Sequence, residues 1–117
     1  MKHVRYDEVQ CKEATEAGAE GVRVRWLISK EDGAPHFYMR RFELVPGGHT
    51  PRHRHAWEHE VYILEGEGTV FCEGREEDFA AGDVIYVAPD EEHSFAAGGR
   101  GSVAFLCLVP RQALQAR

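Results

Sequence analysis

Cysteines and long apolar runs are scarce in this sequence, and both shortages limit what the protein can be. Its three cysteines, Cys11, Cys72 and Cys107, are an odd number with no CxxC pair, so neither a disulfide scaffold nor a thiolate zinc site is indicated. No apolar run reaches the roughly 18 residues that cross a bilayer, and the charged start MKHVRYDEVQ lacks the apolar stretch of a signal peptide. We therefore expect a cytoplasmic protein with reduced thiols and no membrane partner.

Basic residues are also too few and too scattered for a protein that binds nucleic acid. The chain has 14 Lys and Arg against 20 Asp and Glu, which gives a formal net charge of -6. A nucleic-acid-binding surface would instead show a basic stripe attracted to phosphate. We expect no nucleic-acid partner.

What the sequence does contain is frequent glycine and proline, with segments rich in Val, Ile, Phe and Tyr between them. This pattern is typical of a mostly β domain. Strands this short need a barrel or a two-sheet sandwich to bury enough apolar surface. We predict one all-β domain over residues 1–117, with its core at 21–110, peripheral segments at 1–20 and 111–117, and strands at residues 21–29, 36–45, 48–55, 59–65, 69–73, 77–79, 83–88, 94–97 and 101–109.

Three histidines fall within the ten residues PRHRHAWEHE at positions 51–60. Because side chains alternate along a strand, His53 and His55 should point to one face and share a metal ion. In a continuous strand His59 would lie about 13 Å beyond His55, so we predict a sharp reversal at residues 56–58 that brings it back. His93, after a turn at residues 89–92, is a fourth candidate ligand. Four imidazoles would leave up to two octahedral positions open for water, dioxygen or substrate.

The same segments resemble the two sequence motifs of the cupin superfamily. PGG at 46–48, HxH at 53–55 and LEGEG at 64–68 resemble the first motif, and the stretch from Gly82-Asp83 through Pro89 to His93 resembles the second. HAWEHEVYILEGEG and VAFLCLVP are similar to small single-domain bacterial cupins of the manganese-binding, four-histidine type. The resemblance implies a jelly-roll barrel of two antiparallel sheets, with metal ligands at His53, His55, His59 and His93.

His59 occupies the position that usually holds the cupin glutamate, which favours four histidine ligands over three histidines and one glutamate. The exchange removes one negative charge from around the ion and makes the site more Lewis acidic. The resemblance implies manganese. Imidazole does not select among divalent metals, and affinity peaks at copper, so Fe, Ni, Cu and Zn are the alternatives.

Several neighbouring side chains are candidates for the site, each with a simpler alternative. Glu58 and Glu60 border His59, where they either orient a ligand histidine and act in acid–base chemistry or form a solvated acidic pair. Tyr62 and Tyr86 are further acid–base candidates. Cys107 shares a strand face with Phe105 and either lies beside the metal or is an inert buried cysteine.

The remaining candidates are less specific. Trp57 either caps the mouth of the pocket or fills the turn. Arg40, Arg41 and Arg54 either steer an anionic substrate or form surface ion pairs. His3, His36 and His49 fit no metal-ligand spacing and are assigned ordinary structural or surface positions.

Three functions agree with this pattern. The first is a metal-dependent oxidoreductase of dioxygenase type acting on a small molecule, with an apolar cavity that restrains reactive intermediates. The second is a non-redox isomerase, lyase or decarboxylase that uses the ion as a Lewis acid. The third is a module that binds metal and a small ligand without turnover. We further expect a homodimer, because the strand at 21–29 and the doubly apolar strand at 101–109 otherwise leave exposed edges.

Overall fold

The computed structural model describes residues 1–115, and the all-β single domain expected from the sequence is confirmed. The predicted C-terminal segment includes residues 116–117, which lie outside the described residues. No helix within the described range is long and apolar enough to span a membrane. The elements in chain order are η1 (Tyr6–Glu8), β1 (Cys11–Glu13), β2 (Glu20–Ile28), η2 (Lys30–Asp32), β3 (Phe37–His49), β4 (His59–Glu65), β5 (Glu67–Cys72), β6 (Arg75–Ala80), β7 (Val84–Val87), β8 (His93–Ala97), β9 (Val103–Pro110) and α1 (Gln112–Gln115).

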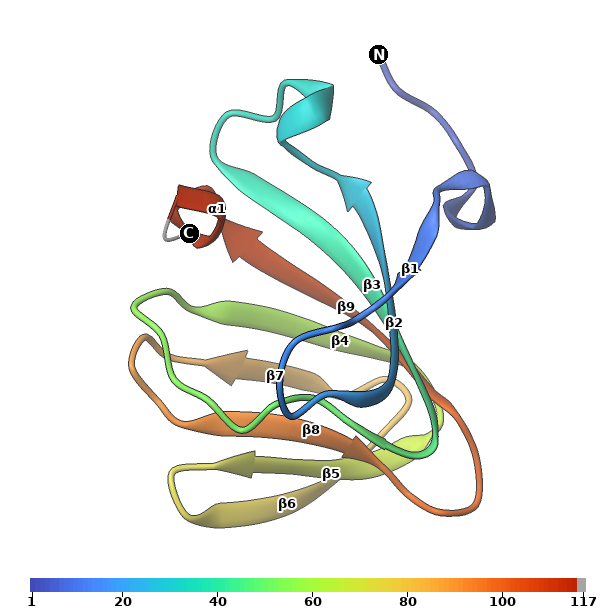
Figure 1. Cartoon of the computed structure of the whole chain (residues 1–117), viewed down its shortest axis with the longest axis vertical. Helices are drawn as coiled ribbons and strands as arrows, with labels where there is room; N and C mark the ends of the chain where they lie inside the picture. The colour runs from blue at the N-terminus through green and yellow to red at the C-terminus, as the bar shows by residue number, and fades with distance from the viewer. Residues whose placement is uncertain (116–117) are drawn as a thin grey trace.

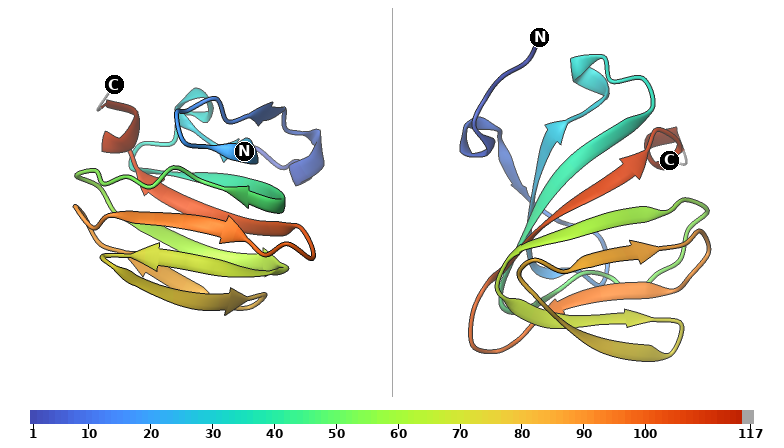
Figure 2. Two further views of the ribbon diagram at one scale, coloured as in Figure 1. Left: turned by 60° about the horizontal axis from the view of Figure 1, so that its bottom comes forward. Right: turned by 180° about the vertical axis from the view of Figure 1, so that it is seen from behind.

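The strands form one antiparallel sheet that curls on itself. Its order is β6-β5-β8-β3-β9-β4-β7, with β2 added beside β3 and β1 beside β2. Strands β2, β3 and β9 lie on one side of the molecule and β8, β5 and β6 on the other (Figure 1, Figure 2). β3 pairs with β9 along residues 37–44 but with β8 only through His49 and Ala96. The two layers predicted for the barrel are therefore hydrogen-bonded into one sheet at the end of β3.

The prediction of two separate strands at residues 36–45 and 48–55 is wrong, because β3 continues to His49. Val22 pairs with Leu44 and Glu20 pairs with His49, so residues 45–48 bulge out of the ladder. Gly47 has a φ of 79°, a left-handed conformation that glycine adopts without steric cost. The Pro-Gly-Gly stretch thus marks a bulge in a long strand, and residues 50–58 contain only a single bridge, at His53.

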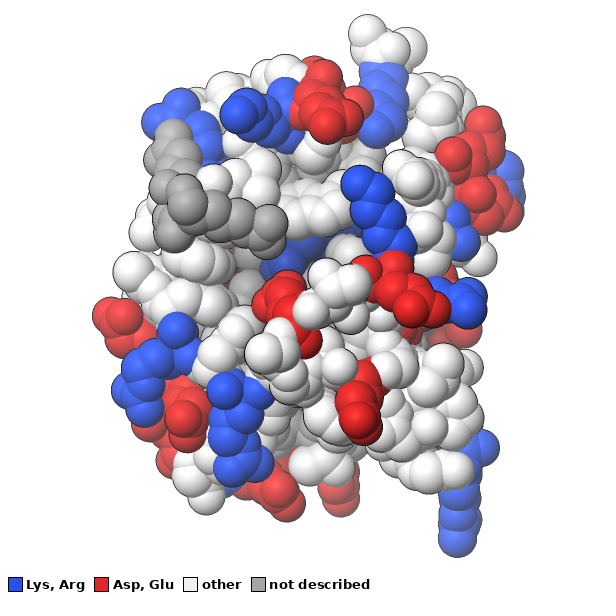
Figure 3. All heavy atoms as spheres, viewed as in Figure 1, with Lys and Arg blue, Asp and Glu red and all other residues white. Residues whose placement is uncertain are grey.

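The apolar core lies between the layers. Phe105, Cys107 and Val109 on β9 are 1%, 3% and 2% exposed, which confirms the inward face predicted for this strand. Leu44 and Ile63, at 0% exposure, pack in the same cluster. On the outside, acidic and basic side chains are interspersed over the face shown in Figure 3.

The homodimer stays a prediction, but the reason given for it is wrong, because β9 lies between β3 and β4 and β2 lies between β1 and β3. β7 is an edge of the curled sheet, and its Val84 and Tyr86 are 74% and 62% exposed. An exposed apolar edge strand is a surface that a second chain can cover by strand pairing and burial.

Gly66, between β4 and β5, should tolerate no side chain. Its φ is 85°, and an added Cβ would lie 2.2 Å from the carbonyl oxygen of Ser102. Gly66→Ala should lower the free energy of unfolding by more than about 2 kcal/mol, because left-handed strain of about 1 kcal/mol is joined by a backbone clash. Urea unfolding measures the loss.

Gly74→Ala is the matched control for Gly66→Ala. Gly74 has a φ of 79°, but an added Cβ would meet nothing within 4 Å. Gly74→Ala should therefore lower the free energy of unfolding only by the cost of the left-handed conformation, about 1 kcal/mol. Equal decreases in the free energy of unfolding of the two variants would show that the close approach of Gly66 to the Ser102 carbonyl does not affect stability.

Candidate metal centre

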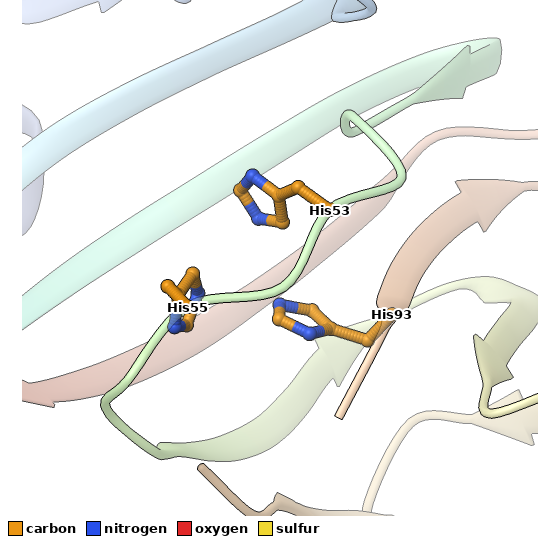
Figure 4. Close-up of side chains that lie close together, drawn as sticks. All are labelled: His53, His55 and His93. Atoms are coloured by element: carbon orange, nitrogen blue, oxygen red, sulfur yellow. The ribbon is translucent and has the colours of Figure 1, made fainter. Parts of the chain in front are cut away.

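The loop between β3 and β4 is held against the start of β8 by backbone hydrogen bonds. The N–H of His53 donates to the His93 carbonyl at 3.1 Å, and the N–H of His93 donates to the His53 carbonyl at 2.9 Å. A third bond, from the Asp90 N–H to the His55 carbonyl at 2.8 Å, fixes the loop two residues further on. As a result the side chains of His53, His55 and His93, from segments far apart in sequence, converge (Figure 4).

The reversal predicted between His55 and His59 is confirmed. The chain bends at Ala56 and Trp57, and His59 is the first residue of β4. The His55 ring stacks on Trp57 with centroids 4.1 Å apart and an interplanar angle of 7°. Trp57 therefore packs within the turn and also lines the cavity beside the histidines.

All four histidines predicted as ligands lie in one cluster. Ring centroids of neighbouring pairs are 4.7 to 5.0 Å apart. The ligand atoms of His53, His55 and His93 lie within 4.8 Å of one another, and His59 joins them through its contacts with His55 and His93. That these residues bind a metal stays a prediction.

Hydrogen bonds fix which ring nitrogens can bind a cation. Nδ1 of His55 lies 2.8 Å from the Trp57 carbonyl, and Nδ1 of His93 lies 2.8 Å from the Glu91 carbonyl. A carbonyl only accepts, so both Nδ1 atoms carry the proton and both Nε2 atoms carry a lone pair. Nε2 of His93 is buried and has no hydrogen-bond partner among the described residues. Such an unpaired buried acceptor is what a metal ion would satisfy.

The distance between His55 Nε2 and His59 Nε2, 2.9 Å, also fits a shared cation. Two nitrogens about 2.1 Å from one ion and at right angles to each other would be about 3.0 Å apart, against about 3.4 Å for a tetrahedral angle. Without an ion, a proton on His59 Nε2 must bridge the pair, because two lone pairs repel. With an ion, that proton belongs on Nδ1, where the Cys107 sulfur lies 3.2 Å away.

Burial keeps the four imidazoles neutral. Desolvation, with smaller contributions from neighbouring histidines and Arg40, lowers the pKa of His55 to about 4 and that of His59 to about 2. The pKa values of His53 and His93 are also lowered, mainly by desolvation. A neutral imidazole has the free lone pair that metal binding requires.

The histidines border a cavity of about 340 Å³ between the two layers. Much of its wall is aromatic, with Trp26, Phe42, Phe95 and Phe105 contributing rings. Both ends of the described chain also contribute to the wall, through Ala14, Glu16, Ala19, Ala113 and Leu114. The cavity therefore suits a small molecule with an apolar body.

Glu16, Arg40 and Arg54 are the charged residues of this wall. Arg40 and Arg54 were candidates for steering an anionic substrate, whereas sequence reasoning did not place Glu16 in the cavity. Arg40 shares strand parity with Phe42 and Leu44, and that alternation is a signal that points it inward. Glu16 gave no signal, because its position depends on how the segment before β2 folds back over the barrel. Arg41 faces the other way and pairs with Glu43 at 2.6 Å.

Cys107 lies where the site hypothesis placed it, buried beside the cluster with its sulfur 3.2 Å from His59 Nδ1. Burial raises the pKa of this thiol, against a smaller opposing effect of Arg40. The cysteine is therefore a neutral thiol that touches a candidate ligand. It is not an activated thiolate.

The other acid–base candidates are not brought to the cavity. Glu60 and Tyr62 are exposed on the outer side of β4, which alternates with the inward His59, Val61 and Ile63. Glu58 lies with Glu60 beside an outer groove, and Tyr86 is exposed on β7. Residues adjacent in a strand face opposite sides, so the positions of Glu58 and Glu60 agree with the alternative of a solvated acidic pair.

Comparisons with known proteins agree with this architecture. Residues 40–109 match the model of the family described as Cupin domain. An oxalate-binding protein from Thermotoga maritima is 36% identical over 97 residues, which is 79% of this chain and 78% of that protein. The dimethylsulfoniopropionate lyase DddW of Ruegeria pomeroyi is 37% identical over 82 residues, 68% of this chain and 53% of the lyase.

The structure is also similar to a solved enzyme. The polyketide cyclase RemF from Streptomyces resistomycificus superposes with a TM-score of 0.89 at 38% sequence identity, covering 94% of this chain and 79% of the cyclase. Proteins similar to this chain in sequence or in structure thus have names that describe different roles. Fold similarity alone does not select among them.

The metal-free chain should lose stability as the pH falls below the ordinary histidine pKa of 6.5. The unfolded chain takes up protons there, whereas His55 stays neutral in the folded chain to about pH 4 and His59 to about pH 2. Because the unfolded state binds more protons in this range, the free energy of unfolding decreases as the pH is lowered. The decrease is at most about 1.4 kcal/mol per pH unit for each histidine. Urea unfolding at pH 7 and pH 5 after chelation measures the change.

His59→Gln should reduce this pH dependence, while His3→Gln, at the exposed start of the chain, should preserve it. An unfolding free energy that is equal at pH 7 and pH 5 would contradict the burial of neutral imidazoles in the cluster.

Proposed function

This chain belongs to the cupin domain family, and we propose that it is a metal-dependent enzyme acting on a small organic molecule. One divalent ion is held by His53, His55, His59 and His93. The observation that carries the proposal is the convergence of imidazole lone pairs, with the buried Nε2 of His93 unpaired and the Nε2 atoms of His55 and His59 only 2.9 Å apart. The cavity beside this cluster gives a substrate access to the ion.

The resident metal of this proposal is manganese. The sequence resemblance supports it, and Fe, Ni, Cu and Zn fit the same nitrogen ligands. When bound, the ion acts as a Lewis acid that polarises a carbonyl or enolate oxygen. The chain keeps the ligands neutral by burial, orients two of them through the carbonyls of Trp57 and Glu91, and excludes water with its aromatic wall.

Removing a ligand should abolish metal binding. His53→Ala and His93→Ala should each retain less than about a tenth of the wild-type metal after dialysis, and should lose the rise in melting temperature that saturating metal gives by mass action. His36→Ala, beside the outer groove, is the control. Elemental analysis and thermal unfolding provide the two measurements. Equal metal content in all three variants would refute the ligand assignment.

The reaction class we favour is non-redox conversion at a carbonyl or enolate, of the cyclase, lyase or decarboxylase type. Two similar proteins, a polyketide cyclase and a dimethylsulfoniopropionate lyase, have names that describe chemistry without net oxidation. Such chemistry requires a group that moves a proton. Glu16 is the only carboxylate among the described residues that lines the cavity, so we assign it this role.

The dioxygenase-type oxidoreductase is the second candidate. The position of the acid–base groups favours it, because Glu58, Glu60, Tyr62 and Tyr86 all lie away from the cavity. An oxidative reaction depends less on such groups and more on an apolar wall that restrains reactive intermediates, which Phe42, Phe95 and Phe105 supply.

Oxygen dependence separates the two candidates. The zinc-loaded chain, assayed under argon with aromatic 1,3-diketones and β-keto acids, should show turnover that Glu16→Gln lowers about a hundred-fold in kcat. Glu13→Gln, on the exposed side of β1, should change kcat less than two-fold. Product formation is followed by chromatography, and oxygen uptake by an electrode.

The alternative outcomes are distinct. Oxygen uptake by the manganese- or iron-loaded chain, with no anaerobic product, would favour the dioxygenase-type reading. Substrate binding without turnover under either condition would favour a binding module, a role that the name of the Thermotoga maritima protein describes for that relative.

A further inference from the structure

Arg40 occupies an unusual position for an arginine, inside the cavity beside the histidine cluster. It lies opposite Cys107 in the register between β3 and β9. Its Nη2 donates to the Cys107 sulfur at 3.1 Å and lies 3.4 Å from His59 Nδ1. The guanidinium is also 4.8 Å from the centroid of Phe42 and 5.3 Å from that of Trp26. The group is therefore held in place by an aromatic wall and by contact with a candidate ligand.

Most of the hydrogen-bonding capacity of this guanidinium is unused. Arg40 Nε is buried and has no partner, and within residues 1–115 no carboxylate lies within ion-pair distance of the group. The neighbouring Arg41 differs, because it pairs with Glu43 at 2.6 Å. Arginine N–H groups and charge are rarely buried without a partner, because desolvation is costly. The described residues therefore supply no anionic partner to Arg40 in this part of the cavity.

We propose that Arg40 is the anion-binding residue of the cavity, and that the substrate is a carboxylate with an aromatic or apolar body. The planar guanidinium matches the two oxygens of a carboxylate. Trp26, Phe42 and Phe105 supply the apolar surface for the rest of the molecule. The claim about the substrate of the metal centre rests on the proposed function. The claim that Arg40 binds an anion is independent of it.

The charge balance supports the same conclusion. The four imidazoles are neutral, so a divalent ion on them would keep its charge of +2, and Arg40 adds another positive charge close by. Among the described residues, the wall offers one carboxylate in return, Glu16, which is exposed. A substrate with negative charge would neutralise the cavity, whereas a neutral substrate would leave it strongly positive.

Benzoate and benzamide form a suitable pair of probes, because they have nearly the same shape and differ in charge. In a ¹H–¹⁵N NMR titration of the metal-free and zinc-loaded chain, benzoate should shift the Arg40 Nε–H signal and bind at least about ten-fold more tightly than benzamide. A group that only positions His59 would show no such response to the charge of the probe. Equal affinities for the two probes in the wild-type chain would overturn the proposal.

Variants separate anion binding from a structural role. Arg40→Gln should lose the preference for benzoate, and Arg40→Lys should retain part of it because the charge remains. Arg52→Gln, which removes an exposed positive charge that packs on Phe71 outside this cavity, should keep the wild-type preference. If Arg40→Gln weakens both probes equally, or leaves the preference intact, Arg40 is not the anion-binding residue.

Zinc content, measured on the same samples, distinguishes the two proposals. Loss of zinc from the wild-type chain on dialysis would overturn the metal centre and leave the metal-free titration as the test of Arg40. A chain that retains zinc but shows no preference for benzoate would overturn the anion site alone.

Discussion

Two backbone hydrogen bonds between His53 and His93 are the interaction on which the candidate metal centre depends. The loop that carries His53 and His55 has no regular strand structure of its own, so this bridge substitutes for a sheet ladder. It holds the loop beside the start of β8 and fixes the backbone from which the His53 and His93 imidazoles extend. The bend at Ala56 and Trp57 then returns the chain to β4 with His59 as its first residue. Without the bridge, the loop would keep its backbone bonds at Thr50 and His55, but His53 would lose both of the bonds that position it.

The electrostatics of the cavity follow from that burial. Removing the imidazoles from water disfavours their protonated form, which keeps their nitrogens available as ligands. The carbonyls of Trp57 and Glu91 select the nitrogen that faces inward. Arg40 and Cys107 form a second layer around His59, one contributing charge and the other a polarisable sulfur. The cluster thus offers neutral donors to a cation, and negative charge in the cavity would have to come largely from a bound molecule.

Much of the site could be predicted from the sequence because it depends on local spacing. The pair His53 and His55, the reversal before His59 and the inward face of β9 all follow from side-chain alternation and strand rise. The bulge at residues 45–48 could not be predicted in the same way, because a glycine that allows a positive φ serves a turn or a bulge equally well. Glu16 was missed because its position depends on long-range pairing of the segment before β2. The two alternatives for Glu58 and Glu60 could not be separated from the sequence, because adjacency to His59 in the chain does not mean adjacency in space.

The cavity wall is contributed partly by the two ends of the chain, while every candidate ligand comes from the middle. Ala14, Glu16 and Ala19 precede the main barrel strands, and Ala113 and Leu114 follow them. Residues in these end segments can therefore change size or polarity during evolution without disturbing the geometry of the histidines. The size and polarity of the cavity are thus set partly by segments that the histidine cluster does not need for its own geometry.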